Sequence, residues 1–186
     1  TALGLLGAIQ KNQGKLRRAA EFCQQALNEA HGSPTAAQVQ VFLASVFYEW
    51  NDLNAASEHL EQAFKASQQI GSLAIQPDIY RLMAYIHLAR GEAASALDLV
   101  NEFHQLVQNA DFPPARVTAA ALQADIALAQ GDILSANHWM NQMTEGMDPS
   151  ALGMLYGLTK ARLSLAEGNR AEAAKILADV YNSVAQ

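Results

Sequence analysis

A short turn motif recurs five times along the chain, and its regular spacing limits what the chain can fold into. Each copy is a Gly or Asn followed by a charged or amide residue, and successive copies are 37, 40, 40 and 37 residues apart. The copies are Gly14-Lys15, Asn51-Asp52, Gly91-Glu92, Gly131-Asp132 and Gly168-Asn169. A constant period of about 20 to 50 residues is typical of repeat proteins, in which each repeat packs on its neighbours.

The residues around the five turns also agree with one another. Five residues after each turn stand Ala19, Ala56, Ala96, Ala136 and Ala173. Seven residues before it stand the small residues Gly7, Ala44, Ala84, Ala124 and Ala161. Nine residues after it stand the apolar residues Cys23, Leu60, Val100, Met140 and Leu177. Because small residues let two helices cross closely, each repeat is predicted to be a pair of antiparallel helices whose apolar site packs against the next repeat.

The positions of the prolines support these boundaries, because all five fall between repeats and none interrupts a predicted helix. They are Pro34, Pro77, Pro113, Pro114 and Pro149, and proline is unfavourable inside a helix but accepted in its first turn. Helices are predicted at about 2–13 and 15–30, 34–50 and 52–70, 76–90 and 92–109, 113–130 and 132–146, and 149–167 and 169–185.

The predicted fold is therefore all-α, an α-α superhelix or solenoid of about five helical hairpins. It forms one domain over 1–186, with repeats at about 1–32, 33–72, 73–111, 112–147 and 148–186. Repeat five ends in an apolar stripe of Val180, Tyr181 and Val184 that would need a neighbour. The chain also begins inside a first helix and ends just after a last one, so we expect a fragment of a longer protein.

Composition excludes several other classes of protein. Hydrophobic residues make up 51% of the 186 residues, 36 of them Ala, and only 16% are charged, which is not the composition of a disordered chain. Cys23 is the one cysteine, so no disulfide framework is possible within the chain. No stretch is apolar enough to span a membrane, and the start does not resemble a secretory signal, so we expect a cytoplasmic location. The net charge of -6 argues against a nucleic-acid surface, and the densest basic cluster is only Lys15, Arg17 and Arg18.

The residues offer no support for catalysis, a metal site or a cofactor. Gly14-Lys15 resembles the end of a phosphate-binding loop, but Leu16 stands where that motif needs Ser or Thr. The five histidines have no partner at metal-ligand spacing. Cys23 occupies an apolar repeat position and is interpreted as a buried small hydrophobic residue. We therefore predict that the chain is not an enzyme.

Recognition is the chemistry that remains. In a solenoid of helical hairpins the first helix of each hairpin lines the concave face. Six residues before each turn the sequence varies, through Ala8, Ser45, Tyr85, Asp125 and Arg162, and neighbouring turns of the same helices add Gln38, Glu49 and Arg81. A groove with an aromatic ring, opposed charges and amides suits a peptide, a sugar or a protein surface. The alternative is that these side chains are merely solvated, and Tyr48 and Trp50 are interpreted as packing aromatics. We expect joint replacement of Tyr85 and Arg162 to impair binding without unfolding the domain.

The repeat pattern resembles that of tetratricopeptide repeats. The matching positions are Leu6-Gly7 before the first turn, the Ala five residues after every turn, and Ala26 and Ala63 twelve residues after the first two. The pattern departs from the family at Phe103, Met143 and Val180, and the period exceeds the usual 34 residues or so.

The longer repeat is similar to the superhelical sensor domain of MalT-type activators, the large ATP-binding regulators of the LuxR class. The segments that carry this resemblance are Tyr48-Glu49-Trp50-Asn51-Asp52-Leu53 with 55–63, Leu88-Ala89-Arg90-Gly91-Glu92 with Ala96-Leu97, and Leu128-Ala129-Gln130-Gly131-Asp132 with Trp139.

The resemblance implies a domain that senses a small-molecule inducer or a partner protein and transmits the signal to other domains of the same regulator. Those domains would be an upstream nucleotide-binding switch and a downstream helix-turn-helix, which would contact DNA in place of this acidic domain. The resemblance gives no role to individual residues. The alternative is a tetratricopeptide scaffold or adaptor that binds proteins or peptides outside transcription, and a helix-turn-helix beyond Gln186 would favour the activator.

Overall fold

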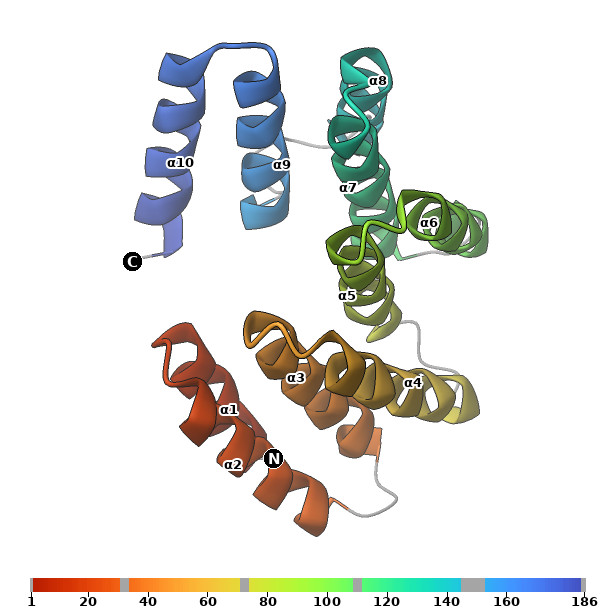
Figure 1. Ribbon diagram of the computed structural model, residues 1–186, viewed down its shortest axis with the longest axis vertical. Helices are drawn as coiled ribbons and strands as arrows, with labels where there is room; N and C mark the ends of the chain where they lie inside the picture. The colour runs from red at the N-terminus through yellow and green to blue at the C-terminus, as the bar shows by residue number, and fades with distance from the viewer. Residues whose placement is uncertain (1, 31–33, 71–73, 109–111, 145–152, 185–186) are drawn as a thin grey trace. The chain divides into compact units, whose positions relative to one another are not determined.

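The computed structural model describes residues 2–30, 34–70, 74–108, 112–144 and 153–184, and these residues form ten helices without a strand (Figure 1). The helices are α1 (Ala2–Asn12), α2 (Leu16–Glu29), α3 (Pro34–Glu49), α4 (Leu53–Ile70), α5 (Gln76–Ala89), α6 (Ala93–Gln108), α7 (Pro113–Ala129), α8 (Ile133–Thr144), α9 (Gly153–Ala166) and α10 (Arg170–Val184). The all-helical prediction is confirmed. The predicted start of the ninth helix at Pro149 lies outside the described residues.

The five turns share one backbone conformation, which explains why the sequence marks them so clearly. Their first residues have positive φ, namely Gly14 (72°), Asn51 (60°), Gly91 (77°), Gly131 (76°) and Gly168 (81°). Glycine adopts this left-handed region without a steric penalty, and Asn is one of the few other residues that tolerate it.

In three of the repeats, the residue after the Gly or Asn of the turn caps the start of the second helix. Asp52 Oδ1 accepts a hydrogen bond from the Ala55 amide at 3.1 Å, and Asp132 Oδ1 accepts one from the Ser135 amide at 3.0 Å. Asn169 Oδ1 accepts the equivalent bond from the Glu172 amide at 3.2 Å. Such caps satisfy amides that have no partner inside the helix, so the turn residues both end one helix and begin the next.

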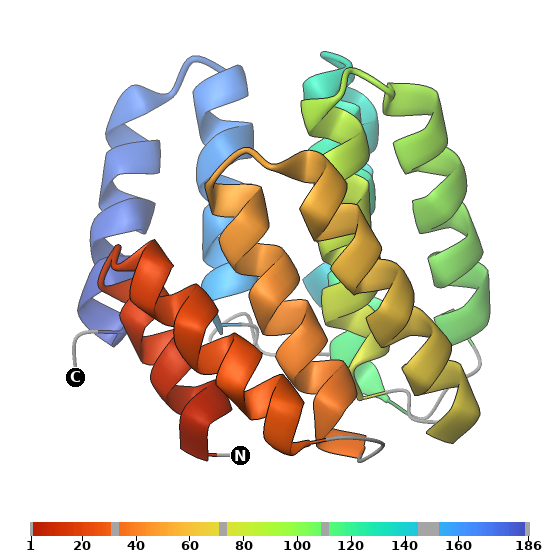
Figure 2. The same ribbon diagram turned by 60° about the horizontal axis from the view of Figure 1, so that its bottom comes forward.

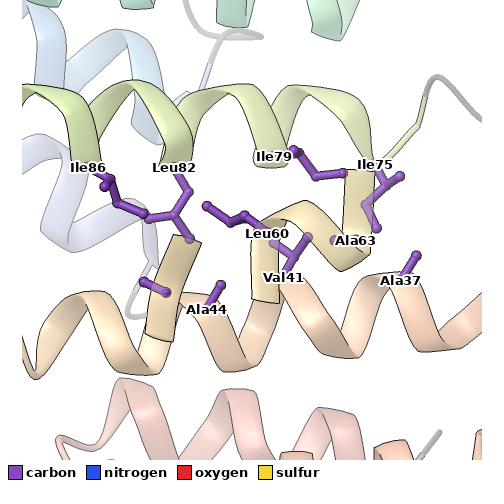
Figure 3. Packing of buried hydrophobic residues seen from close by; sticks show 10 residues of the cluster. Ala37, Val41, Ala44, Leu60, Ala63, Ile75, Ile79, Leu82 and Ile86 are labelled. Atoms are coloured by element: carbon purple, nitrogen blue, oxygen red, sulfur yellow. The ribbon is translucent and has the colours of Figure 1, made fainter. Parts of the chain in front are cut away.

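The chain divides into two compact units, residues 1–86 (unit 1) and 87–186 (unit 2), with the division inside α5. Unit 1 contains α1 to α4 and most of α5. Its main core joins Ala37, Val41 and Ala44 of α3, Leu60 and Ala63 of α4, and Ile75, Ile79, Leu82 and Ile86 at and along α5, as Figure 3 shows. A second cluster, around Cys23 of α2 and Leu43 of α3, connects the first hairpin to the second.

Unit 2 contains α6 to α10. Alanines of α7 pack there against Ala136, Met140 and Met143 of α8 and against Leu163 of α9. The small residues predicted to lie at helix crossings are buried in all five repeats, from Gly7 and Ala19 to Ala161 and Ala173. The apolar site nine residues after the turn is buried in four repeats, while Leu177 in the fifth is 43% exposed.

The surface of the last helix is partly apolar, as the sequence indicated for repeat five. Tyr181 is 73% exposed, whereas Val180 packs over Gly157 of α9. The side chain of Val184 lies outside the described part of the chain. None of the described helices is both long enough and apolar enough to cross a bilayer.

Candidate functional site

Four of the residues predicted to bind a partner line one groove in unit 1. Ser45 and Glu49 of α3 and Arg81 and Tyr85 of α5 line a hollow of about 230 Å³. We call this hollow the α1–α3–α5 groove, because Lys11 of α1 completes its lining. It is therefore formed by the first helices of the first three hairpins, the helices to which the sequence assigned recognition.

Helix geometry explains why these residues come together. Ser45 and Glu49 are four residues apart, as are Arg81 and Tyr85, and residues at this spacing lie on the same side of a helix. Neighbouring sides of α3 and α5 supply Ala44, Ile79 and Ile86 to the core of unit 1 (Figure 3), which fixes the rotation of each helix. The core thus determines which side chains of α3 and α5 are left to line the groove.

Two cations stand in the groove, and each is held by a hydrogen bond. Lys11 Nζ donates to Ser45 Oγ at 3.2 Å, and Ser45 Oγ donates to the Phe42 carbonyl at 2.7 Å. Arg81 Nη2 donates to Asp78 Oδ1 at 2.8 Å, and the two side chains are 37% and 45% exposed. The ammonium and the guanidinium are therefore positioned and still accessible to a bound group.

The groove also contains carboxylates and aromatic rings. Glu49 is exposed and has no hydrogen-bond or ion-pair partner among the described residues. Tyr48 and Tyr85 contribute rings, while Val41 and Leu82 contribute apolar surface from the edge of the core. The groove can therefore offer hydrogen-bond donors, acceptors and apolar contact to one ligand.

Sequence reasoning missed three of the polar residues in the groove, Lys11, Tyr48 and Asp78. Lys11 and Tyr48 both stand three residues before their turn, and Asp78 stands thirteen residues before Gly91. These positions are three and seven residues from the variable position six before the turn, so they share its side of the helix. A search of the residues three and seven positions away from the variable position would have found all three.

The other three predicted residues lie outside the groove. Gln38 is half-buried on α3 and does not line it. Asp125 and Arg162 belong to unit 2, where Arg162 Nη1 donates to Asp125 Oδ2 at 2.8 Å and joins α9 to α7. The Asp125 side chain is only 5% exposed, whereas that of Arg162 is 51% exposed. Tyr85 and Arg162, which the sequence grouped together, are thus found in different units.

A smaller hollow of about 160 Å³ adjoins the groove and shares Lys11 and Ser45 with it. Cys23 and Gly7 line this hollow, and Cys23 is fully buried, as the sequence predicted. Burial raises the pKa of the Cys23 thiol to about 11, so the sulfur is protonated at neutral pH. The described residues include no group of three or more His, Cys, Asp or Glu side chains arranged to hold a metal ion.

Comparison with known proteins agrees with the repeat architecture. The family model of the MalT-like TPR region matches residues 1–186. No curated protein sequence matches the chain.

Solved structures share the fold along the length of the chain. The chain is similar to BtubC (BKLC) from P. vanneervenii, with a TM-score of 0.67 and 18% identity over 98% of this chain and 78% of that one. It is also similar to the nearly identical TPR-like repeats of a putative kinesin light chain from Podosopora anserina, with a TM-score of 0.65 and 18% identity over 97% and 92% of the two chains. A tetratricopeptide repeat protein from Parabacteroides merdae has a TM-score of 0.55 and 16% identity, over all of this chain and 66% of that one. The fold is therefore an α-solenoid of about five tetratricopeptide-like hairpins.

Proposed function

Because the chain belongs to the MalT-like TPR region family, we propose that it is the sensing domain of a LuxR- or MalT-type bacterial transcriptional activator. It binds a small-molecule inducer or a partner protein, and this binding regulates DNA-binding and ATPase domains outside this chain. The domain itself needs no cofactor and carries out no reaction.

The α1–α3–α5 groove is the observation that supports this proposal most. It brings together an ammonium, a guanidinium, two carboxylates and two tyrosine rings around a partly apolar surface. Binding sites typically combine apolar lining with a few well-placed polar groups. Glu49 has no partner among the described residues, so its carboxylate is available to a ligand.

The size of the groove indicates what enters it. Its volume of about 230 Å³ is below the roughly 300 to 1,000 Å³ that encloses a drug-sized ligand. The groove therefore accommodates a group such as one sugar ring or one or two peptide side chains. A larger inducer or a protein partner would insert one part of itself here and leave the remainder outside.

Transcript profiling in the native host tests the proposed function. Arg81→Ala and Tyr85→Ala together remove the guanidinium and one ring from the groove. The matched control replaces the exposed Lys65 and Gln68 of α4 by Ala, which also removes one cation and one neutral side chain. Lys65 forms an exposed ion pair with Glu61, whereas the pair of Arg81 with Asp78 is part-buried. The melting temperature of each variant is therefore measured first, and only folded variants are compared.

The groove variant should lose the induced expression of a defined set of promoters, and the control should retain it. An unchanged transcript profile in a folded groove variant would contradict the proposed role in a transcriptional activator. If the same variant lost a protein partner but its transcripts were unchanged, the result would support the adaptor function instead.

A further inference from the structure

A third hollow lies in unit 1 where the first two hairpins turn. It measures about 520 Å³ and is lined by residues 14–18, at the first turn and the start of α2, and by Trp50, just after α3. Figures 1 and 2 both show the α1–α2 and α3–α4 turns at the same end of unit 1. The hollow shares no lining residue with the α1–α3–α5 groove.

Three cations surround this hollow without a carboxylate partner. Lys15, Arg17 and Arg18 are all exposed, and none forms an ion pair among the described residues. Lys15 Nζ donates to the Gln13 amide oxygen at 2.9 Å, which leaves its charge uncompensated. The chain has 12 Lys and Arg residues and a net charge of -6, so a quarter of its cations gather at one hollow of an otherwise acidic protein.

The start of α2 differs from the equivalent helix starts in other repeats. Asp52, Asp132 and Asn169 cap α4, α8 and α10, whereas Lys15 occupies this position in α2 and makes no capping bond. Cations near a helix N-terminus are unfavourable because that end of the helix is already positive. A negatively charged partner bound here would offset the unfavourable interaction between these cations and the positive end of α2.

Trp50 provides an ordered aromatic surface beside the cations. Its side chain is 41% exposed although the indole is held on one side by Phe47, with ring centroids 5.7 Å apart and an interplanar angle of 67°. Phe47 in turn stacks on His59 at 5.3 Å. Trp and Arg are the residues that most often dominate the energy of protein interfaces. The exposed indole therefore offers apolar contact inside a basic rim.

We propose that this basic-aromatic surface, formed by Lys15, Arg17, Arg18 and Trp50, docks an acidic protein segment that carries an apolar side chain. Carboxylates of the segment pair with the cations, and its apolar side chain packs on Trp50 and Leu16. A short acidic segment fits better than a nucleic acid, because the net negative charge of the chain repels an extended polyanion.

Fluorescence anisotropy with a labelled synthetic peptide tests the proposal. The probe is a ten-residue peptide of Asp, Glu and Ser with one central Leu, and a second peptide has Ser in place of Leu. The wild-type chain should bind the Leu peptide saturably, and binding should weaken as ionic strength rises to about 0.15 M because the charges are exposed. Arg17→Glu with Arg18→Glu should weaken it by about tenfold or more, since two attractive charges become repulsive.

The matched control is Arg170→Glu with Lys175→Glu on α10, which changes the net charge equally and should leave binding within about twofold. The Ser peptide should bind several-fold more weakly than the Leu peptide, a comparison that leaves the protein unchanged. The proposal is overturned by any of three results: no binding by the wild type, equal loss in both charge variants, or equal affinity for the two peptides. The proposal is also overturned if single-stranded DNA displaces the labelled peptide as effectively as the unlabelled peptide does, because the surface would then bind polyanions in general.

Discussion

Gly7 shows how closely the helices of one hairpin approach each other. A Cβ atom added there would lie 2.5 Å from the Sγ of Cys23 and 3.2 Å from the carbonyl oxygen of Ala19. Although Ala favours a helix over Gly by about 1 kcal/mol, overpacking typically costs about 1 to 3 kcal/mol. We therefore expect Gly7→Ala to lower the free energy of unfolding, measured by urea denaturation.

A double-mutant cycle identifies the contact responsible. Cys23→Ala removes the sulfur that the new methyl group would meet, so Gly7→Ala should cost less in that background than in the wild type. An equal cost in the two backgrounds would show that the sulfur does not limit the size of the residue at position 7.

His104 links the stability of unit 2 to pH. It lies half-buried on α6 against Trp139 of α8, with ring centroids 5.2 Å apart, and its Nδ1 is buried without a hydrogen-bond partner among the described residues. Burial lowers the pKa of His104 below its ordinary value of 6.5. The unfolded chain therefore takes up the proton before the folded one does, and stability falls as the pH drops from about 7 through the ordinary value.

The measurement is the urea midpoint at several pH values for the wild type and for His104→Gln. The variant should lose less stability than the wild type between about pH 7 and pH 5. Because burial also lowers the pKa of His59, against an opposing effect of Glu58, the difference between the two proteins is the informative quantity. Identical pH profiles would refute a contribution from His104.

At the scale of single elements, the second turn offers a direct test of why Gly recurs in the motif. Asn51 has a φ of 60°, in the region where the other four turns have glycine. Asn51→Ala should lower the free energy of unfolding by about 1 to 2 kcal/mol, because an ordinary side chain is strained in this conformation. Asn51→Gly should be neutral or slightly stabilising. An Ala variant as stable as the wild type in thermal melts would contradict this explanation.

The helices were predictable because the residues that end and start them are local. The predicted helix at 52–70 is observed as Leu53–Ile70, since Asn51 and Asp52 determine the turn and the cap themselves. The groove was only partly predictable. Ser45 and Tyr85 share a repeat position and a groove, but the contribution of Lys11 depends on how α1 packs beside α3.

Asp125 illustrates the limit of the repeat position as a guide. It is equivalent in sequence to Ser45 and Tyr85, yet it is buried because α7 is covered on almost every side, with every residue from 118 to 127 buried. Helical periodicity shows which residues share a side of a helix. Whether that side meets solvent depends on the neighbouring helices, which the repeat pattern alone does not specify.

At the scale of the whole molecule, the division into two units predicts where a core defect is felt. Leu60 is fully buried in the core of unit 1, and Leu60→Ala should cost about 2 to 5 kcal/mol. Repeats gain stability mainly from their nearest neighbours. In hydrogen exchange read by mass spectrometry, peptides from α1 to α4 should therefore lose more protection than peptides from α7 to α10. Equal loss along the chain would instead indicate one cooperative unit.

The small residues explain how a chain with few aromatic residues can present a binding surface. Gly and Ala at the helix crossings bring the two helices of a hairpin close together, and the larger side chains of α3 and α5 are left at the core and at the groove. In our proposal the α1–α3–α5 groove receives the inducer or partner that the domain senses, whereas the basic-aromatic surface takes an acidic segment.

Site-specific photo-crosslinking in the native host tests that claim most directly. A benzophenone amino acid replaces Tyr85 in the groove or, as the control, the exposed Lys65 on α4. Position 85 should give a discrete adduct, identifiable by mass spectrometry, that is absent at position 65 and is lost when Arg81→Ala is added. The absence of an adduct at position 85, or the same adducts at both positions, would contradict the assignment of the groove as the recognition site.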